Sequence, residues 1–252
     1  MNVLLLFAMI ALLLLLRQNL VVILFLVAAY IHLVFGDGQV IYIIEDMWNG
    51  ANKEVLLSIP LFVLAGNLMT RGSIARRLID VAGALTAPLP GGMAAATIVA
   101  CAIFAAISGS STVTLLAIGS IMYPAMVRAG YSKLYAMGAV CAGGTLGIII
   151  PPSIPMILYG ISTEASITAL FTAGIIPGLI LAGVFIVHGM VVNRHMPRRR
   201  WTVTELSGSF ARGIGALGLP TIILGGIYSG VMTVTESAAI GLLYALIVEV
   251  LV

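Results

Sequence analysis

Two groups of helix-breaking residues interrupt an otherwise apolar sequence. Residues 108–111, Ser-Gly-Ser-Ser, separate apolar runs at 92–107 and 112–127, and residues 151–153, Pro-Pro-Ser, interrupt a second apolar region. In hydrocarbon every peptide group needs an internal partner, so such an interruption persists only where it lines a cavity or holds a ligand. Two interruptions in one chain predict an ion and substrate site built from broken helices.

The oxygen atoms at these interruptions suit a hard cation such as Na⁺, which takes several oxygen ligands as calcium does. Residues 108–111 offer hydroxyls and freed carbonyls. Pro151 and Pro152 lack the N–H groups that would otherwise occupy carbonyls one turn earlier. The two turns would then share one cation. Taken alone, the serine-rich turn fits a small-residue packing surface or a bend better, but the second break favours the ion site.

The same interruptions supply positive potential for an anionic substrate. Helix N-termini carry unsatisfied N–H groups and the positive end of the helix dipole, which suit a carboxylate. Thr112 begins one half-helix and Ser153 the other, and each adds a hydroxyl. Asn67, in the middle of an apolar run, either lines the site or makes a hydrogen bond between helices.

Other polar and sulfur-bearing residues within apolar runs favour structural interpretations. His32 and His188 are candidates for a proton relay, but an interfacial or hydrogen-bonded histidine is the favoured interpretation. Cys101 and Cys141 have no CxxC motif and no nearby histidine, so both are expected to be buried packing residues. Glu236 near a helix start would complement the helix dipole.

Two glycine pairs, 91–92 and 143–144, do not form phosphate-binding loops. No GxxxxGK[ST] arrangement follows them, so nothing in the sequence indicates an ATP site. These glycines predict close helix packing or a hinge.

The composition is that of a polytopic membrane protein. Of 252 residues, 61% are hydrophobic and 8% are charged, whereas soluble domains carry about 25% charged residues. The net charge of +3 follows from basic residues in cytoplasmic loops, and no aromatic-interleaved basic face indicates nucleic-acid binding. The first apolar run has no basic n-region and no small-residue cleavage site, so a retained helix is expected.

Several apolar runs are shorter than the about 20 residues that cross a bilayer. The runs fall at 3–16, 20–35, 55–70, 92–107, 112–127, 134–163, 166–192, 217–232 and 237–252. The paired runs 92–107 and 112–127 would each reach about 24 Å. This length suits a re-entrant hairpin better than two full spans, although both alternatives give the same topology.

The basic cluster at 193–200 is expected in the cytoplasm, and counting crossings from it leaves the N-terminus outside. Three segments, 39–53, 72–87 and 201–213, mix apolar with charged residues. Each predicts either an amphipathic helix in the headgroup plane or a solvated connector, and the planar helix is favoured for 72–87.

Six stretches together resemble the large membrane subunit of the tripartite ATP-independent periplasmic (TRAP) transporters, and the resemblance covers nearly the whole chain. They are SIPLFVLAGNLM at 58–69, AISGSSTVT at 106–114, GTLGIIIPPSIPMILYG at 144–160, LFTAGIIPGL at 170–179, LPTIILGGIYSG at 219–230 and TVTESAA at 233–239. The combination of SGSS with GTLGIIIPPS is specific to this family.

The resemblance implies an all-α polytopic membrane protein with an ion-transporter-like elevator fold, a re-entrant helical hairpin and broken helices. It places Na⁺ coordination on Ser108, Ser111, Gly147, Ile150 and Pro152, the last three through backbone carbonyls. The expected substrate-binding residues are Ser110, Thr112, Ser153 and Asn67. No cofactor is expected besides the coupling ion Na⁺.

The resemblance also implies a function and partners. The expected function is Na⁺-coupled import of an organic acid across the bacterial inner membrane, with no enzymatic activity. The implied partners are a small membrane subunit, a periplasmic substrate-binding protein, the organic acid and membrane lipid.

The expected organisation has five parts. They are 1–54, N-terminal spans and an interfacial helix of a scaffold; 55–91, a span plus an amphipathic arm helix; 92–163, a re-entrant hairpin and a broken helix of a transport domain; 164–216, a long span and a basic cytoplasmic loop; and 217–252, the start of a second half.

The chain departs from the family pattern in two respects. Val234 replaces the proline that usually precedes the helix of Glu236, and the second, inverted repeat is largely absent. The chain therefore resembles an N-terminal portion, and a non-transporting scaffold or assembly subunit is an alternative function. A remote alternative is an intramembrane hydrolase with Ser108 or Ser110 as nucleophile and His32 or His188 as base.

Overall fold

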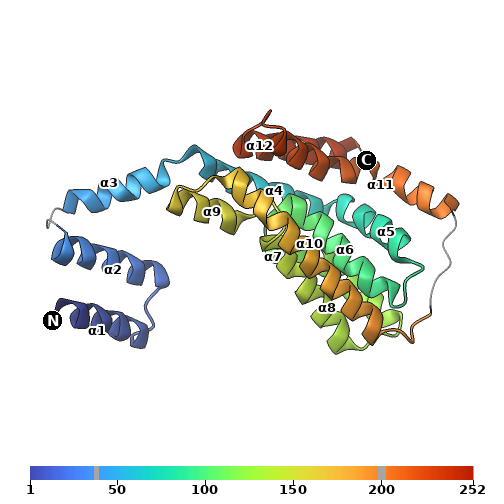
Figure 1. Cartoon of the computed structure of the whole chain (residues 1–252), viewed down its shortest axis with the longest axis horizontal. Coiled ribbons are helices and arrows are strands. Elements are labelled where there is room, and N and C mark those ends of the chain that lie inside the picture. The colour runs from blue at the N-terminus through green and yellow to red at the C-terminus, as the bar shows by residue number, and fades with distance from the viewer. Residues whose placement is uncertain (37–39, 198–202, 252) are drawn as a thin grey trace. The chain divides into compact units, whose positions relative to one another are not determined.

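A computed structural model describes residues 1–36, 40–197 and 203–251, and within these ranges all regular structure is helical (Figure 1). The chain divides into two compact units, Met1–Lys53 and Glu54–Val252. The helical structure and the apolar composition fit a polytopic membrane protein.

The first unit contains a helical hairpin followed by a third helix. Its helices are α1 (Asn2–Leu15), α2 (Leu20–Phe35) and α3 (Val40–Ala51). Asn19 begins α2 by accepting a hydrogen bond from the Val21 N–H at 3.0 Å, and the Tyr30 hydroxyl donates to the Asn2 carbonyl at 2.9 Å. His32 Nε2 lies 3.3 Å from Asp46 Oδ2, so this histidine has a carboxylate partner, in agreement with the favoured interpretation.

The second unit carries both predicted breaks. Its elements are η1 (Glu54–Leu57), α4 (Ser58–Arg71), α5 (Ile74–Thr86), α6 (Gly92–Ser108), α7 (Ser111–Arg128), α8 (Lys133–Thr145), η2 (Leu146–Ile148), α9 (Ile154–Thr163), α10 (Ile167–Val192), α11 (Val203–Tyr228) and α12 (Val234–Leu251). The 134–163 run is therefore divided into α8, η2 and α9, as the Pro-Pro-Ser interruption predicts.

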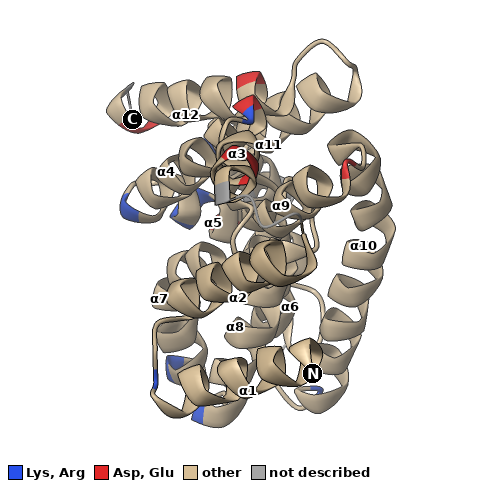
Figure 2. Cartoon of the chain, turned by 90° about the vertical axis from the view of Figure 1, so that its left-hand side faces the viewer, with Lys and Arg blue, Asp and Glu red and all other residues tan. Residues whose placement is uncertain are grey.

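Four segments of the described chain are long and apolar enough to cross a membrane: Glu54–Arg71, Ser111–Arg128, Ile167–Val192 and Leu206–Tyr228. Figure 2 shows α7, α8 and α10 as long uncharged stretches with charged residues near their ends. The shorter helix α6 has 17 residues. It packs against α7, to which it is joined by a short turn at Gly109.

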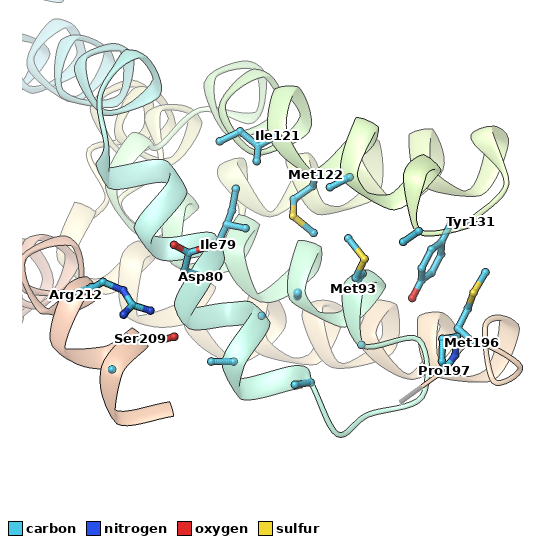
Figure 3. A pocket seen from close by; sticks show the side chains of 18 of the residues that line it. Ile79, Asp80, Met93, Ile121, Met122, Tyr131, Met196, Pro197, Ser209 and Arg212 are labelled. Atoms are coloured by element: carbon cyan, nitrogen blue, oxygen red, sulfur yellow. The ribbon is translucent and has the colours of Figure 1, made fainter. Parts of the chain in front are cut away.

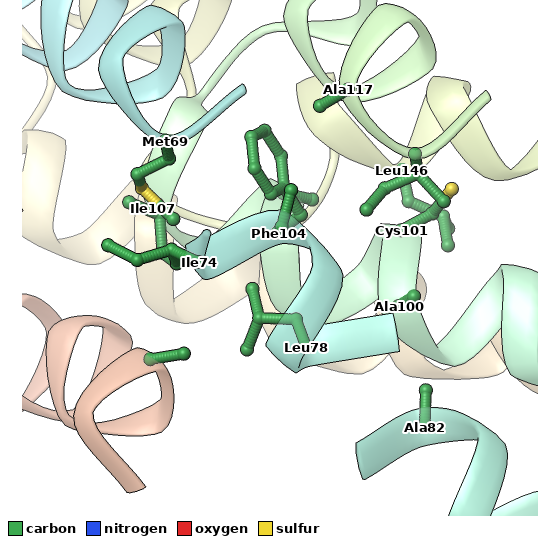
Figure 4. Close-up of a cluster of buried hydrophobic side chains, with 14 of the residues drawn as sticks. Met69, Ile74, Leu78, Ala82, Ala100, Cys101, Phe104, Ile107, Ala117 and Leu146 are labelled. Atoms are coloured by element: carbon green, nitrogen blue, oxygen red, sulfur yellow. The ribbon is translucent and has the colours of Figure 1, made fainter. Parts of the chain in front are cut away.

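Helix α6 is the centre of the second unit. It packs against α4, α5, α7, α8, α10 and α11, and its residues Cys101, Phe104 and Ile107 are fully buried. Figure 4 shows these side chains among Met69 of α4 and Leu78 of α5. A helix that is apolar on every face is stable in this central position because it exposes no side to water.

The glycine pair of α8 allows this helix to approach α6 and α7 closely. A Cβ atom at Gly143 would lie 2.8 Å from Cys101 Sγ of α6, and one at Gly144 would lie 2.9 Å from Leu115 Cβ of α7. The predicted packing role of these glycines is confirmed, because any side chain here would push α8 away from one of its neighbours.

The segment 72–87 is an amphipathic helix, α5. Its buried face carries Ile74, Leu78 and Val81, whereas Arg76 and Asp80 are exposed. The buried face packs against α6 and α11, so α5 is not a solvated connector.

Two expectations from the sequence are wrong. Cys141 is exposed, although Cys101 is buried as expected, because position 141 lies on the face of α8 opposite its packing partners. The segment 201–213 is not separate from the following span. Residues 203–228 form one continuous helix, and Gly213 within it packs tightly against Val81 of α5. Residues 201 and 202 lie outside the described ranges.

The start of α5 is held by a carboxylate from α12. Glu249 accepts hydrogen bonds from Ser73 N–H through Oε2 at 2.7 Å and from Ile74 N–H through Oε1 at 3.0 Å. Its carboxylate packs directly against Gly72, at a distance that leaves no room for a Cβ atom there. A negative charge at a helix N-terminus satisfies free N–H groups and complements the helix dipole.

The other end of α12 is fixed by a capping box. Glu236 Oε2 accepts from Thr233 N–H at 2.7 Å, and Thr233 Oγ1 accepts from Glu236 N–H at 3.2 Å. This arrangement satisfies two N–H groups at the helix start. The structural role expected for Glu236 is thus confirmed, since it lies in the first turn of α12.

We expect Gly143→Ala to lower stability by about 1–3 kcal/mol, because the new methyl group meets Cys101 in a close-packed interior. The matched control is Gly138→Ala on the same helix, where a Cβ atom meets nothing within 4 Å. This control should gain up to about 1 kcal/mol from helix propensity. Thermal unfolding in detergent micelles compares them, and equal effects of the two substitutions would contradict the proposed packing.

We expect Glu249→Ala to free the N-terminus of α5. Loss of a charged acceptor for two N–H groups should cost about 1.5–3 kcal/mol. Hydrogen–deuterium exchange should accelerate at 73–76, whereas Glu164→Gln, an exposed control, should leave it unchanged. Unaltered exchange at 73–76 in Glu249→Ala would show that the carboxylate does not hold this helix start.

Candidate functional site

The two predicted interruptions lie in direct contact. Gly109 forms the turn between α6 and α7 with φ +61°, a left-handed conformation that glycine adopts without strain. Its carbonyl accepts a hydrogen bond from Ile154 N–H, at the start of α9, at 3.1 Å. The Pro152 carbonyl oxygen lies 2.9 Å from where a Cβ atom of Gly109 would be. The serine-rich turn and the Pro-Pro-Ser break are therefore joined through their backbones.

A second backbone contact joins Gly147 to the start of α7. A Cβ atom at Gly147 would lie 2.6 Å from the Ser110 carbonyl oxygen and 2.9 Å from Ser111 N. Only glycine allows this approach, because backbone atoms cannot rotate away as a side chain can. All three residues at this contact belong to the predicted site.

The break releases the carbonyl groups on which Na⁺ coordination was placed. Pro151 has no N–H to donate to Gly147, and Ile154 N–H bonds to Gly109 instead of to Ile150 one turn earlier. Pro152 would also leave the Ile148 carbonyl without a donor, but the Ser153 hydroxyl bonds to it at 2.7 Å. Within the described residues no other hydrogen bond reaches the carbonyls of Gly147 and Ile150, so both oxygens are available to a ligand.

The serine hydroxyls of the turn differ in their surroundings. Ser108 Oγ lies 2.8 Å from Thr114 Oγ1, and both residues are fully buried. Ser110 begins α7, where its Oγ accepts a long hydrogen bond from Val113 N–H at 3.5 Å. Ser111 is partly buried at the first position of α7. The turn therefore offers a buried hydroxyl pair and two less constrained hydroxyls.

The helix N-termini are less alike than the sequence suggests. At α9 the Ile154 N–H is already bonded to Gly109, and Pro155 has none, so little of this terminus is free for an anion. Ser153 is fully buried, with its hydroxyl bonded to Ile148. At α7 the second residue, Thr112, is exposed. The start of α7 is thus the better place for a carboxylate.

Helix α4 contacts the turn through Gly66 rather than through Asn67. A Cβ atom at Gly66 would lie 3.1 Å from Ser108 Cβ, whereas Asn67 is exposed. Sequence reasoning therefore missed Gly66, and it also missed Thr114 as the partner of Ser108. Thr114 was identifiable as a hydroxyl residue placed deep in an apolar run.

The donor set is one of hydroxyl and carbonyl oxygens. Among the described residues no group of three or more His, Cys, Asp or Glu side chains lies together as a metal site. Hydroxyl and carbonyl oxygens fit a hard monovalent cation better than a transition metal, which prefers nitrogen or sulfur ligands.

Residues 6–252 match the family model described as "Tripartite ATP-independent periplasmic transporter, DctM component". The chain belongs to the TRAP transporter large permease family. Among its relatives is the C4-dicarboxylate TRAP transporter large permease protein DctM of Pseudomonas aeruginosa, which is 43% identical over 225 residues, covering 87% of this chain and 52% of the relative.

Two further TRAP permeases show the range of the relatives. The 2,3-diketo-L-gulonate TRAP transporter large permease protein YiaN of Escherichia coli is 39% identical, covering 82% of this chain and 50% of the relative. The isethionate TRAP transporter permease protein DctMQ of Oleidesulfovibrio alaskensis is 39% identical, covering 84% of this chain and 34% of the relative. The chain thus spans about half the length of the first of these relatives.

TRAP permeases are transport proteins and not enzymes, so the hydrolase hypothesis is abandoned. The side chains around its proposed residues agree with this conclusion. The hydroxyl of Ser108 is paired with Thr114, and His188 stacks on the Tyr135 ring with centroids 6.2 Å apart.

The buried hydroxyl pair of this TRAP permease allows a double-mutant cycle. Ser108→Ala and Thr114→Val should each lower stability by about 1 kcal/mol, because each leaves one buried hydroxyl without its partner. The double variant should cost less than the sum of the single variants by about 0.5–1 kcal/mol. Thermal unfolding of the four proteins measures the coupling, and strictly additive effects would show that the two hydroxyls do not interact.

Proposed function

We propose that this chain forms part of the membrane subunit of a Na⁺-coupled secondary transporter that imports an organic acid across the bacterial inner membrane. A small membrane subunit and a periplasmic substrate-binding protein are its proposed partners. The observation that carries the proposal is the backbone contact between the two broken helices, which gathers released carbonyls and hydroxyls in one place.

The proposed Na⁺ ligands are the carbonyls of Gly147, Ile150 and Pro152 and the hydroxyls of Ser108 and Ser111. Gly147 and Ile150 have lost their helical donors, and Pro152 presents its carbonyl toward Gly109. Partial negative charges of this kind replace the water around a hard cation without a full negative charge in the membrane. A bound cation would in turn satisfy peptide oxygens that the break leaves without partners.

The proposed substrate site begins at the N-terminus of α7. Ser110 caps this helix and Thr112 lies in its first turn, at the positive end of the helix dipole, which favours a carboxylate. Ser153 and Asn67 stay predictions from the sequence, since the Ser153 hydroxyl bonds to Ile148 and Asn67 is exposed on α4. The names of the relatives from P. aeruginosa and E. coli, which mention C4-dicarboxylate and 2,3-diketo-L-gulonate, support an organic acid.

Transport would require the site to face each side of the membrane in turn. We infer that α6 and α7 form a re-entrant hairpin, which moves with α8 and α9 as an elevator while segments 39–53 and 72–87 act as connecting arms. The close packing of α6, α7 and α8 favours their movement as one body. Crosslinks that immobilise the two arms should stop transport, and unchanged transport rates would count against the elevator.

Ser111→Ala tests the Na⁺ site at a position where the fold does not depend on the hydroxyl. In the full chain in detergent micelles, NaCl should raise the unfolding temperature above that in choline chloride, because a ligand that binds only the folded state stabilises it. Removal of one oxygen ligand should weaken the Na⁺ affinity about tenfold.

The matched control is Ser120→Ala, an exposed serine of the same helix whose hydroxyl bonds to Ala117 at 3.0 Å. This variant should keep the wild-type response to Na⁺. Equal stabilisation by Na⁺ and choline in the wild type, or an unchanged Na⁺ affinity in Ser111→Ala, would refute the proposed ion site.

A further inference from the structure

A large cavity lies between α5, α6, α7 and α11, apart from the two helix breaks. Its volume is about 900 Å³, within the range of roughly 300–1,000 Å³ for pockets that hold small molecules. The described lining includes none of the residues of either break. Figure 3 shows it extending from Asp80, Ser209 and Arg212 at one end to Tyr131 and Met196 at the other.

The middle of this cavity is apolar. Ile79, Met93 and Met122 project into it, together with alanines of α5, α6 and α7 (Figure 3). Methionine side chains adapt their shape to an irregular or flexible apolar ligand. A small acid with several charges would lose its hydration here without gaining polar partners. The middle of the cavity therefore suits a hydrocarbon chain.

One end of the cavity carries opposite charges. Asp80 of α5 and Arg212 of α11 both line it and are exposed, yet they form no ion pair with each other in the described structure. Arg77 Nη1 donates to the Arg212 carbonyl at 3.1 Å, and this bond fixes α11 beside α5. An arginine guanidinium binds phosphate through two parallel hydrogen bonds, and a carboxylate binds an ammonium group.

Basic helix ends lie near both ends of the cavity: the first turn of α5 is near Asp80, and the α7–α8 junction is near Tyr131. Arg76 and Arg77 lie in the first turn of α5, Arg128 ends α7 and Lys133 begins α8. By the positive-inside rule these ends belong to the cytoplasmic interface. Phospholipid headgroups occupy this depth, so the charged end of the cavity lies at headgroup level.

We propose that this cavity binds an aminophospholipid, a membrane lipid whose headgroup carries a phosphate diester and a primary ammonium group. Arg212 binds the phosphate, Asp80 binds the ammonium, and one acyl chain lies along Met93 and Met122. The bound lipid fills the space between α5 and α11 on one side and α6 and α7 on the other. This inference goes beyond the proposed transport function and does not depend on it.

The test is lipid binding to the delipidated full chain, measured by native mass spectrometry. The probes are phosphatidylethanolamine, phosphatidylglycerol and phosphatidylcholine with identical acyl chains. The wild type should bind phosphatidylethanolamine most tightly. Arg212→Gln should weaken the binding of all three lipids about tenfold, and Asp80→Asn should weaken phosphatidylethanolamine by a similar factor without weakening phosphatidylglycerol.

Matched controls are Arg76→Gln on α5 and Glu164→Gln after α9, because both residues are exposed and neither lines the cavity. Both controls should bind the three lipids as the wild type does. Equal affinity of the wild type for the three lipids would overturn the proposal. Displacement of the lipid by C4-dicarboxylates, or unchanged binding in both Arg212→Gln and Asp80→Asn, would also overturn it.

Discussion

Peptide groups that have lost their helical partners dominate the chemistry of this protein. In an apolar surrounding each such group is costly, and its cost is removed only by another polar group. The Gly109 carbonyl and the Ile154 N–H satisfy each other across the two breaks, and the Ser153 hydroxyl satisfies Ile148. The described hydrogen bonds do not reach the carbonyls of Gly147 and Ile150, and these are two of the oxygen atoms that we propose for the ion.

The surrounding helices maintain this arrangement because they allow little adjustment. Helix α6 is largely buried, and the glycine pair of α8 packs closely against α6 and α7. Close-packed interiors transmit displacements rather than absorb them. Movement of one break relative to the other would therefore disturb the packing of α6, α7 and α8.

The sequence predicted the two helix breaks well and the placement of individual side chains less well. The positions of the breaks followed from residues with strong backbone effects, namely Gly109, Pro151 and Pro152, whose consequences are local. The contact of Gly66 instead of Asn67 with the turn, and the exposure of Cys141, depend on which face of a helix meets its neighbours. Hydropathy carries little information about that face when both lipid and protein interior are apolar.

The difference between local backbone effects and tertiary packing also explains which helices and contacts the sequence predicted. Helices α1, α2 and α10 follow their apolar runs closely, because helix formation within such a run needs no tertiary information. The single helix α11 was missed because polar residues before 217 resembled a separate surface segment. The bond between Ser108 and Thr114 depends on the rotation of the chain at Gly109, and the bond from Ile154 to Gly109 depends on how α9 meets this turn.

The Glu249 carboxylate has a further consequence for how the protein is assembled. Its two oxygen atoms accept hydrogen bonds from Ser73 and Ile74, which lie 176 and 175 positions earlier in the sequence. During synthesis the beginning of α5 emerges long before α12, so its N–H groups must remain hydrated or find temporary partners until the later helix arrives. The α4 to α5 corner is therefore completed late in membrane insertion, because the start of α5 reaches its final hydrogen bonding only after α12 has been synthesised.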